Sequence, residues 1–352
     1  MTPFSGWEMQ SQLENSLFLK ACRGETTERT PIWLYRQAGR YMSEYHAVKG
    51  NTPSLDFFKT PSLAAKVTCD AQRILGVDAA ILFADLLPIL EPMGLDLDYL
   101  PGIGPNINNP IRDHRDIDEL KVTRASESVA YIGETIRLAR RELPSDIPLI
   151  GFAGAPFTLA SYAIEGKGSK NYLHVKKLMY GDPGAWRTVM EKVTDVVIDY
   201  LNLQIESGVQ AVQLFDSWVG CLTPEAYKHY VLPHSKRLIQ AVSGKVPVIH
   251  FGTGNPALLP LMNESGADVL GIDWRAPLMD SWRSIGAKAV QGNLDPIILC
   301  ADEASVIREA TTILDSVGGR PGHIFNLGHG IIPETPVENV KTLVRTVQEY
   351  QR

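Results

Sequence analysis

The sequence has few cysteines, no excess of positive charge and no long apolar run, and each absence excludes a class of protein. Its four cysteines, among 352 residues, lie far apart and form no C-x-x-C pair. This spacing excludes a small disulfide scaffold, argues against a cysteine-rich zinc site and is typical of reduced thiols in a cytoplasmic protein. Lys and Arg number 34 against 40 Asp and Glu, a formal net charge of -6 that disfavours a bulk nucleic-acid binder.

Signals for secretion or membrane insertion are also missing from the pattern. The segment Met1 to Asn15 is polar and acidic, whereas a secretory signal has a basic stretch followed by an apolar one. The longest apolar stretches have the length of a strand and are broken by charge, as Ala79–Ala84 is by Asp85. We therefore expect a cytoplasmic protein with no membrane span.

What the sequence does contain is an alternation of short apolar runs with longer segments of helical period. Runs that are apolar throughout, without in/out alternation, are typical of parallel strands covered on both faces. Between them, Val189–Ile205 places apolar residues on one face of a helix, and Gly208 follows as a stop signal. The eight runs predicted as strands are Ile32–Tyr35, Ala79–Phe83, Leu149–Phe152, Ala211–Phe215, Val246–Ile249, Val269–Ile272, Ala287–Val290 and Ile324–Leu327.

Eight strands separated by helices predict a single (β/α)8 TIM barrel formed by residues 1–352. A doubly wound sheet is the rival fold, but no G-x-G-x-x-G follows the first run and no Walker A motif is present. The stretch Glu91–Asp118, rich in Pro, Gly and Asn, is interpreted as a long excursion after the second strand. It is not taken as a linker between domains.

Charged residues follow the first two predicted strands, where barrels of this kind place their chemistry. Arg36 and Arg40 are four residues apart, so on a helix they would share a face and grip one anionic ligand through bidentate forks. Structural salt bridges explain such a pair equally well. Asp85 directly follows the second run, and a buried carboxylate there needs either an arginine or the NH groups of a ligand.

Neutral polar side chains follow later strands. Tyr162 is a candidate contact, although such a tyrosine is more often a half-buried core aromatic. Ser217 is a second candidate, although it lacks the G-x-S-x-G elbow and fits a turn. His329, between two glycines, either reaches into the barrel mouth or faces solvent. Together these residues place cations, one carboxylate and neutral donors at one mouth.

Several segments resemble the uroporphyrinogen decarboxylase family, in family order and over nearly the whole chain. Pro31–Tyr41 resembles its N-terminal signature and Gly151–Tyr162 its second signature. Three departures adjoin the first signature: Tyr35 where the family commonly has Met, Met42 where Leu is usual, and Ser43 where Pro is usual. Further matches are Phe83–Asp85, Gln213–Ser217, Gly292–Pro296 and Asn326–Gly330.

The resemblance implies a carboxy-lyase of porphyrin and haem biosynthesis. Its reaction removes the four acetate carboxyls of uroporphyrinogen III to give coproporphyrinogen III and CO2, without metal or organic cofactor, in a (β/α)8 barrel that is usually a homodimer. Asp85 and Arg36 would be the catalytic residues. The residues that the resemblance implies for substrate binding are Arg36, Gln37, Ala38, Gly39, Arg40, Phe57, Asp85, Tyr162, Ser217 and His329.

This chemistry suits the residues, because protonation of a pyrrole ring makes a cation that a fixed carboxylate stabilises, and Asp85 is the candidate. The proton donor is left open: arginine is a poor acid, and a water or the substrate's own carboxyl group are alternatives.

The sequence also bears on two alternative functions. A corrinoid-linked methyltransferase of related barrel fold would need a zinc-binding His-x-Cys after the fifth strand, but the segment here is His250-Phe251-Gly252 and Cys300 alone cannot complete such a site. A non-catalytic porphyrin carrier is the third class, and it would not need Asp85.

Overall fold

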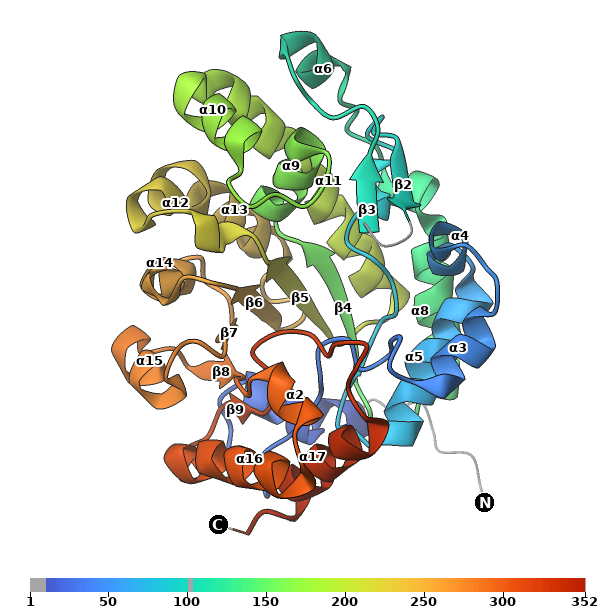
Figure 1. The fold of residues 1–352 in the computed structure, drawn as a ribbon, viewed down its shortest axis with the longest axis vertical. Coiled ribbons are helices and arrows are strands. Elements are labelled where there is room, and N and C mark those ends of the chain that lie inside the picture. The colour runs from blue at the N-terminus through green and yellow to red at the C-terminus, as the bar shows by residue number, and fades with distance from the viewer. Residues whose placement is uncertain (1–10, 101–103, 352) are drawn as a thin grey trace.

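The computed structural model describes residues 11–100 and 104–351, and a curled parallel sheet with helices around it dominates the fold (Figure 1). The sheet has seven strands in the order β1-β4-β5-β6-β7-β8-β9, and every neighbouring pair is parallel. The strands are β1 (Ala80–Ile81), β4 (Leu149–Gly154), β5 (Ala211–Asp216), β6 (Val248–Gly252), β7 (Val269–Gly271), β8 (Ala289–Gln291) and β9 (His323–Ile324).

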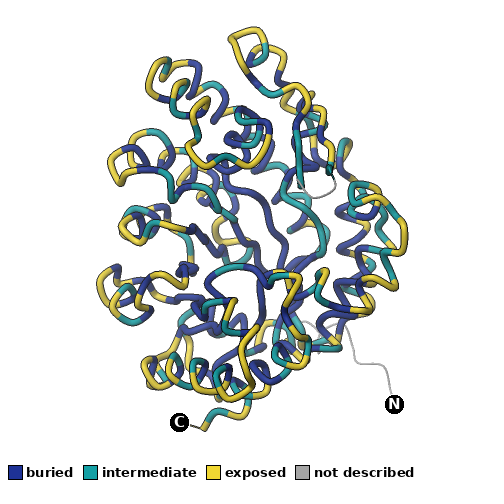
Figure 2. The backbone as a smooth tube through the Cα atoms, viewed as in Figure 1, coloured by how far each residue is buried: buried dark blue, intermediate teal, exposed yellow. Residues whose placement is uncertain are grey.

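The strands are buried almost throughout, as Figure 2 shows in dark blue. All six residues of β4 are buried, because its two faces are covered by the sheet interior and by helices. The predicted α/β class and parallel sheet are confirmed, and each of the seven later apolar runs contains a strand of this sheet or overlaps one.

The first apolar run differs from the prediction, so the sheet has seven strands where eight were predicted. Ile32 forms only an isolated parallel bridge with Phe325. Backbone hydrogen bonds nevertheless hold this run on both sides: Phe325 N–H donates to Pro31 O at 2.8 Å, and Asp78 N–H donates to Ile32 O at 2.8 Å. The run therefore lies between the segment after β9 and the segment before β1.

The helices surround the sheet, and α11 (Pro183–Ser207) contains the predicted Val189–Ile205. Gly208 ends it with a φ of 110°, a left-handed conformation that glycine adopts at little cost. The other helices are α2 (Leu17–Cys22), α3 (Ser43–Lys49), α4 (Ser54–Phe58), α5 (Pro61–Leu75), α6 (His114–Glu119), α7 (Ala125–Ser128), α8 (Ala130–Glu142), α9 (Pro156–Glu165), α10 (Leu173–Gly181), α12 (Pro224–Tyr230), α13 (Leu232–Val242), α14 (Leu259–Asn263), α15 (Leu278–Ile285), α16 (Glu303–Val317) and α17 (Val337–Glu349). Short 3-10 turns are η1 (Pro88–Leu90), η2 (Val219–Cys221), η3 (Pro256–Leu258) and η4 (Pro296–Cys300).

The predicted excursion Glu91–Asp118 contains structure of its own. Its strands β2 (Leu97–Leu100) and β3 (Gly104–Ile107) form an antiparallel hairpin, and α6 follows (Figure 1). Residues 101–103 of this excursion lie outside the described residues. The hairpin was not predicted because Pro, Gly and Asn obscure the alternation that marks a strand.

The three departures from the family signature occupy defined positions. Tyr35 is 2% exposed and lies inside the sheet, where Gln291 Nε2 donates to its hydroxyl at 2.6 Å. Met42 is buried in a small second core with Phe57, and Ser43 is the exposed first residue of α3. Among the described residues, no helix is both long and apolar enough to cross a membrane.

Candidate functional site

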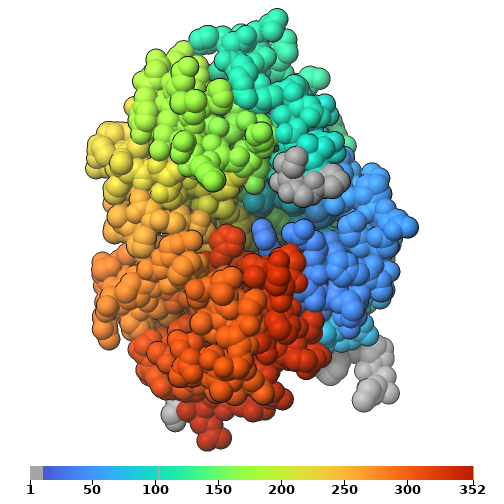
Figure 3. Space-filling model, viewed as in Figure 1, coloured from blue at the N-terminus to red at the C-terminus, as the bar shows by residue number. Residues whose placement is uncertain are grey.

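Polar residues from loops far apart in the sequence meet where the strands end. Arg36 lies within electrostatic range of three of them. Burial raises the pKa of Asp85 and of Tyr162 and the Arg36 charge opposes that rise, while at His329 burial lowers the pKa and Arg36 adds to the effect. Figure 3 shows a recess near the centre of this face, between segments coloured blue, green and red. The structure thus brings together residues from the first run, the β1 loop, α9 and the segment after β9.

The segment that carries the two arginines is not a helix, so the two side chains do not share a helical face. Residues 36–41 form turns and bends, and α3 begins only at Ser43. Arg36 has a φ of 61°, in the left-handed region that side-chain-bearing residues rarely adopt. A Cβ on Gly330 would come within 2.6 Å of Arg36 Cδ, so a larger residue there would displace the arginine stem.

Both arginines have guanidinium groups without a partner among the residues that the structure describes. Arg36 and Arg40 are exposed, and neither forms an ion pair or side-chain hydrogen bond with residues 11–100 or 104–351. The structural salt bridges that offered an alternative explanation are therefore not present in the described part of the chain. Free arginine forks at strand ends are suited to bind the carboxylates of a ligand.

Asp85 follows β1 in a turn, and Leu87 N–H donates to its Oδ1 at 3.0 Å. Burial raises the pKa of Asp85, and the Tyr99 hydroxyl, the Leu87 N–H and Arg36 act in the opposite direction. The Tyr99 hydroxyl lies near this carboxyl without regular hydrogen-bond geometry, since Tyr99 Oη is buried with no partner among the described residues. No lysine or arginine of the described chain forms an ion pair with Asp85, so the carboxylate can still accept hydrogen bonds.

Tyr162 and Ser217 approach the site from α9 and from the end of β5. The Tyr162 ring stacks on Trp218 with centroids 3.9 Å apart. Burial and the nearby Asp85 raise the pKa of Tyr162 to about 12, so its hydroxyl is a hydrogen-bond donor at neutral pH. Ser217 is half-buried, and its carbonyl accepts a hydrogen bond from Thr253 Oγ1 at 2.7 Å.

His329 is half-buried in the segment after β9. Its Nδ1 accepts a hydrogen bond from Gly330 N–H at 2.8 Å, so the neutral ring carries its proton on Nε2 and can donate it. Burial is the main cause of a lowered pKa at His329, and Arg36 adds to it. The histidine is therefore a neutral donor at pH 7.

The remaining predicted binding residues support the site from behind or through their backbone. The Gln37 side chain is 1% exposed and is occupied by Leu34 N–H and Ala79 O, while Ala38 and Gly39 are half-buried in the same turn. Phe57 is completely buried against Phe83 and Tyr45, so its side chain does not reach the surface of the recess.

Sequence reasoning missed two aromatic residues at this site. Tyr99 comes from the β2–β3 hairpin, where no strand was predicted, and nothing in the local pattern singled it out. Trp218 directly follows Ser217 in the chain, so its position after a strand was an available signal.

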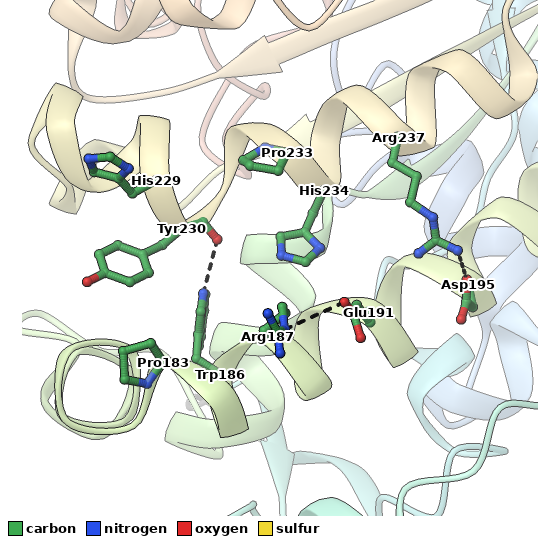
Figure 4. A pocket seen from close by; sticks show the side chains of 10 residues that line it. All are labelled: Pro183, Trp186, Arg187, Glu191, Asp195, His229, Tyr230, Pro233, His234 and Arg237. Carbon is green, nitrogen blue, oxygen red and sulfur yellow. Dashed lines mark hydrogen bonds and ion pairs between the residues drawn. The ribbon is translucent and has the colours of Figure 1, made fainter.

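A separate cavity of about 600 Å³ lies between α11 and the α12–α13 pair. None of the predicted site residues lines it, and Figure 4 shows its Arg237 and Arg187 directed at Asp195 and Glu191. Its arginines are thus paired within the protein, unlike Arg36 and Arg40.

Metal-ligating side chains are not gathered in the described part of the chain. No group of three or more His, Cys, Asp or Glu residues there could hold a metal ion, and the four cysteines are all free thiols. His250 is fully buried and its Nδ1 lies 3.2 Å from Ser265 Oγ, away from the recess.

A curled parallel sheet with polar side chains gathered at its strand ends is the arrangement of an α/β enzyme. The family model for Uroporphyrinogen decarboxylase (URO-D) matches residues 13–350. A protein of Koribacter versatilis named uroporphyrinogen decarboxylase is 51% identical over 96% of both chains. One of the same name from Sorangium cellulosum is 50% identical over 95% of this chain and 96% of its own. The chain belongs to the uroporphyrinogen decarboxylase family, as its motifs predicted.

Solved structures of similar shape agree with this fold. A methyltransferase from Methanosarcina mazei superposes with a TM-score of 0.82 at 20% identity, over 95% of this chain and 98% of its own. A B12-independent methionine synthase from a Shewanella species gives 0.56 at 11% identity, over 82% and 88%. At these identities the likeness concerns the fold alone.

Proposed function

We propose that the protein is a uroporphyrinogen decarboxylase that removes the four acetate carboxyls of uroporphyrinogen III to give coproporphyrinogen III and CO2. The observation that carries the proposal is the Asp85 carboxylate, near the guanidinium group of Arg36, with neither group in an ion pair within the described residues. A substrate with many carboxylates and central pyrrole NH groups offers the complementary partners. The relatives at about half identity carry the name of this activity.

The proposed reaction uses the substrate's own pyrrole as the electron sink. Protonation of the ring carbon next to the one that bears the acetate arm makes a cation whose positive charge is shared by the arm-bearing carbon. The electrons of the breaking C–CO2 bond then flow into the ring through that arm-bearing carbon. A second proton on the methylene carbon and loss of the ring proton leave a methyl group. Asp85 accepts hydrogen bonds from the pyrrole NH groups and stabilises the cation electrostatically in a partly dry pocket.

The other residues hold the substrate. Arg36 and Arg40 bind its acetate and propionate groups, and Arg36, close to Asp85, fixes the reacting arm. Tyr162, Ser217 and the Nε2–H of His329 supply neutral donors, while the backbone of residues 37–39 lines the turn between the arginines. Arg36 is a poor acid, so we assign the proton to a water or to a substrate carboxyl group rather than to the guanidinium.

The test is incubation of the purified protein with uroporphyrinogen under reducing conditions, followed by separation of products by carboxyl number. We expect loss of carboxyl groups down to four, with and without a metal chelator. Methyl transfer to or from a corrinoid instead would favour the methyltransferase. Tight binding without turnover would favour the carrier, and full loss of activity on chelation would overturn the metal-free reaction.

We also propose the finer points of architecture and assembly that the family resemblance implies. The first run closes the sheet into an eight-stranded barrel, which the hydrogen bonds of Pro31 and Ile32 to both flanking segments support. The chain is then one barrel domain, cytoplasmic and homodimeric. Light scattering that gives twice the chain mass would support the dimer, and the mass of a single chain would contradict it.

A further inference from the structure

Behind the candidate site, fully buried polar groups connect β5 and β6 with α9. Asp216 is the last residue of β5, and its neighbour Phe215 stacks on Tyr35 and Phe251 inside the sheet. Because side chains alternate along a strand, Asp216 faces the helices instead. Asp216, His250, Thr158 and Ser265 are each 0% exposed, so their polar atoms depend on one another for partners.

The Thr158 hydroxyl joins the Asp216 carboxylate to the turn after β5. Thr158 Oγ1 donates to Asp216 Oδ1 at 3.1 Å and accepts a hydrogen bond from Trp218 N–H at 3.3 Å. The Trp218 ring in turn stacks on Tyr162. A continuous set of contacts therefore runs from a buried carboxylate to a side chain of the site.

His250 lies next to the other carboxylate oxygen of Asp216. Ser265 Oγ donates its only hydrogen to Met262 O at 2.5 Å, so it accepts a hydrogen bond from Nδ1–H of His250 at 3.2 Å. His250 Nε2 lies 3.5 Å from Asp216 Oδ2, and neither atom has a regular hydrogen-bond partner in the described residues.

We propose that Asp216, His250 and Thr158 are positioning residues that fix the Ser217–Trp218 turn and, through the Trp218 ring, Tyr162. This inference rests on the proposed function, because the turn and Tyr162 are assigned there to the substrate. The three residues contact no substrate, and they act by keeping two neutral donors in place when the reaction begins. If these donors shift slightly, we expect the reaction rate to fall clearly, while the free energy of unfolding changes little.

The first test removes the link alone. Thr158→Val lacks the hydroxyl, and we expect kcat to fall about tenfold, whereas Thr158→Ser keeps the hydroxyl and should stay within about threefold of wild type. The matched control is Thr194→Val, because Thr194 is also 0% exposed but bonds only within α11, to Met190 O. Wild-type kcat in Thr158→Val, or a loss equal to that in Thr194→Val, would overturn the proposal.

The second test changes the Asp216 carboxylate and measures whether its effect on kcat is coupled to that of Thr158. Asp216→Asn should lower kcat, and combining it with Thr158→Val should lower kcat by little more than either change alone, because both break one connected set of contacts. The control is Asp268→Asn, since Asp268 accepts Val248 N–H at 2.9 Å at the opposite end of β6. If the two losses of kcat multiply in the double variant, the two residues have independent structural roles. That result would count against one connected set of contacts.

A third readout does not depend on turnover. The Trp218–Tyr162 stack contributes to the near-ultraviolet circular dichroism, and Trp218→Phe identifies that contribution. We expect Thr158→Val to diminish this signal and Thr158→Ser to retain it, in folded protein without substrate. If the wild-type protein released no CO2, the proposed function would fail while this signal still decided the positioning proposal; an unchanged signal in Thr158→Val would overturn it.

Discussion

Two carboxylates at strand ends, Asp85 after β1 and Asp273 after β7, occupy similar places in the fold but have different partners. Asp273 is 4% exposed and accepts hydrogen bonds from Gly254 N–H and from both the N–H and the guanidinium of Arg275. Asp85 accepts one regular hydrogen bond, from Leu87 N–H, and has no ion-paired cation among the described residues. Position at a strand end thus does not by itself make a carboxylate available to a ligand; spare hydrogen-bonding capacity does.

The strongest test of this comparison is Asp85→Asn, which keeps the shape of the side chain but removes its charge. We expect kcat to fall by at least about two orders of magnitude, equivalent to roughly 2.7 kcal/mol, because the cationic ring loses its stabilising charge. Asp85→Glu should retain some activity, since the charge survives one methylene away. Single-turnover decarboxylation measures both variants, and near-normal kcat in a folded Asp85→Asn enzyme would end the electrostatic assignment.

The arginines provide the next test, because their charge can be kept while the fork is lost. Arg36→Lys and Arg40→Lys should each lower kcat/KM, since a lost hydrogen bond between charged groups is worth about 1.5–3 kcal/mol. Arg237→Lys is the control, because Arg237 is already paired with Asp195 on the outer surface. If either arginine variant keeps wild-type kcat/KM on every intermediate, the arginine changed in it does not bind the substrate as proposed.

On the other side of the comparison, Asp273→Asn should affect stability more than turnover. The change weakens hydrogen bonds to a loop backbone, so we expect a loss of about 1–3 kcal/mol in the free energy of unfolding. The kcat per folded molecule should stay within about threefold of wild type. Denaturant unfolding and active-site titration separate the two effects. A hundredfold loss of kcat at full stability would show that Asp273 belongs to the reaction.

His329→Asn should produce a smaller change, because the neutral donor that we propose for a substrate carboxylate is replaced by another neutral donor. We expect KM to rise severalfold, about the effect of one altered hydrogen bond, with turnover still measurable. Analysis of each intermediate by carboxyl number provides the measurement. Complete inactivity of the folded variant would instead make His329 an obligatory proton carrier.

The smallest effect concerns pH. The pKa of His329 lies below its ordinary 6.5, so below pH 6.5 the unfolded chain takes up a proton that the folded protein resists. The stability that His329 contributes is therefore full above pH 6.5 and is lost as the pH falls through the lowered pKa. Arg36→Leu removes a neighbouring cation and should raise this pKa, which NMR titration of the His329 ring would detect. An unchanged pKa would show that the charge of Arg36 does not act on the His329 ring.

The sequence predicted the α/β class and seven of the strands because these features depend on local pattern. It also indicated Asp85, Tyr162, Ser217 and His329 as candidates, because each follows a predicted strand. It did not predict the left-handed turn at Arg36, since that conformation depends on contacts with the distant Gly330. It also did not predict that Asp216 and His250 would be buried as a pair. Their meeting depends on the register of β5 against β6, which no local pattern contains.

The hydrogen bonds between the first apolar run and Phe325 have a consequence for the order of assembly. Trp33 N–H donates to Phe325 O, so the segment that leads to Arg36 is bound to a segment made much later in synthesis. The arginine turn and the His329 segment therefore cannot meet until the chain has been made as far as His329. Contacts so distant in sequence form slowly, and the recess becomes complete only after the rest of the sheet has been made.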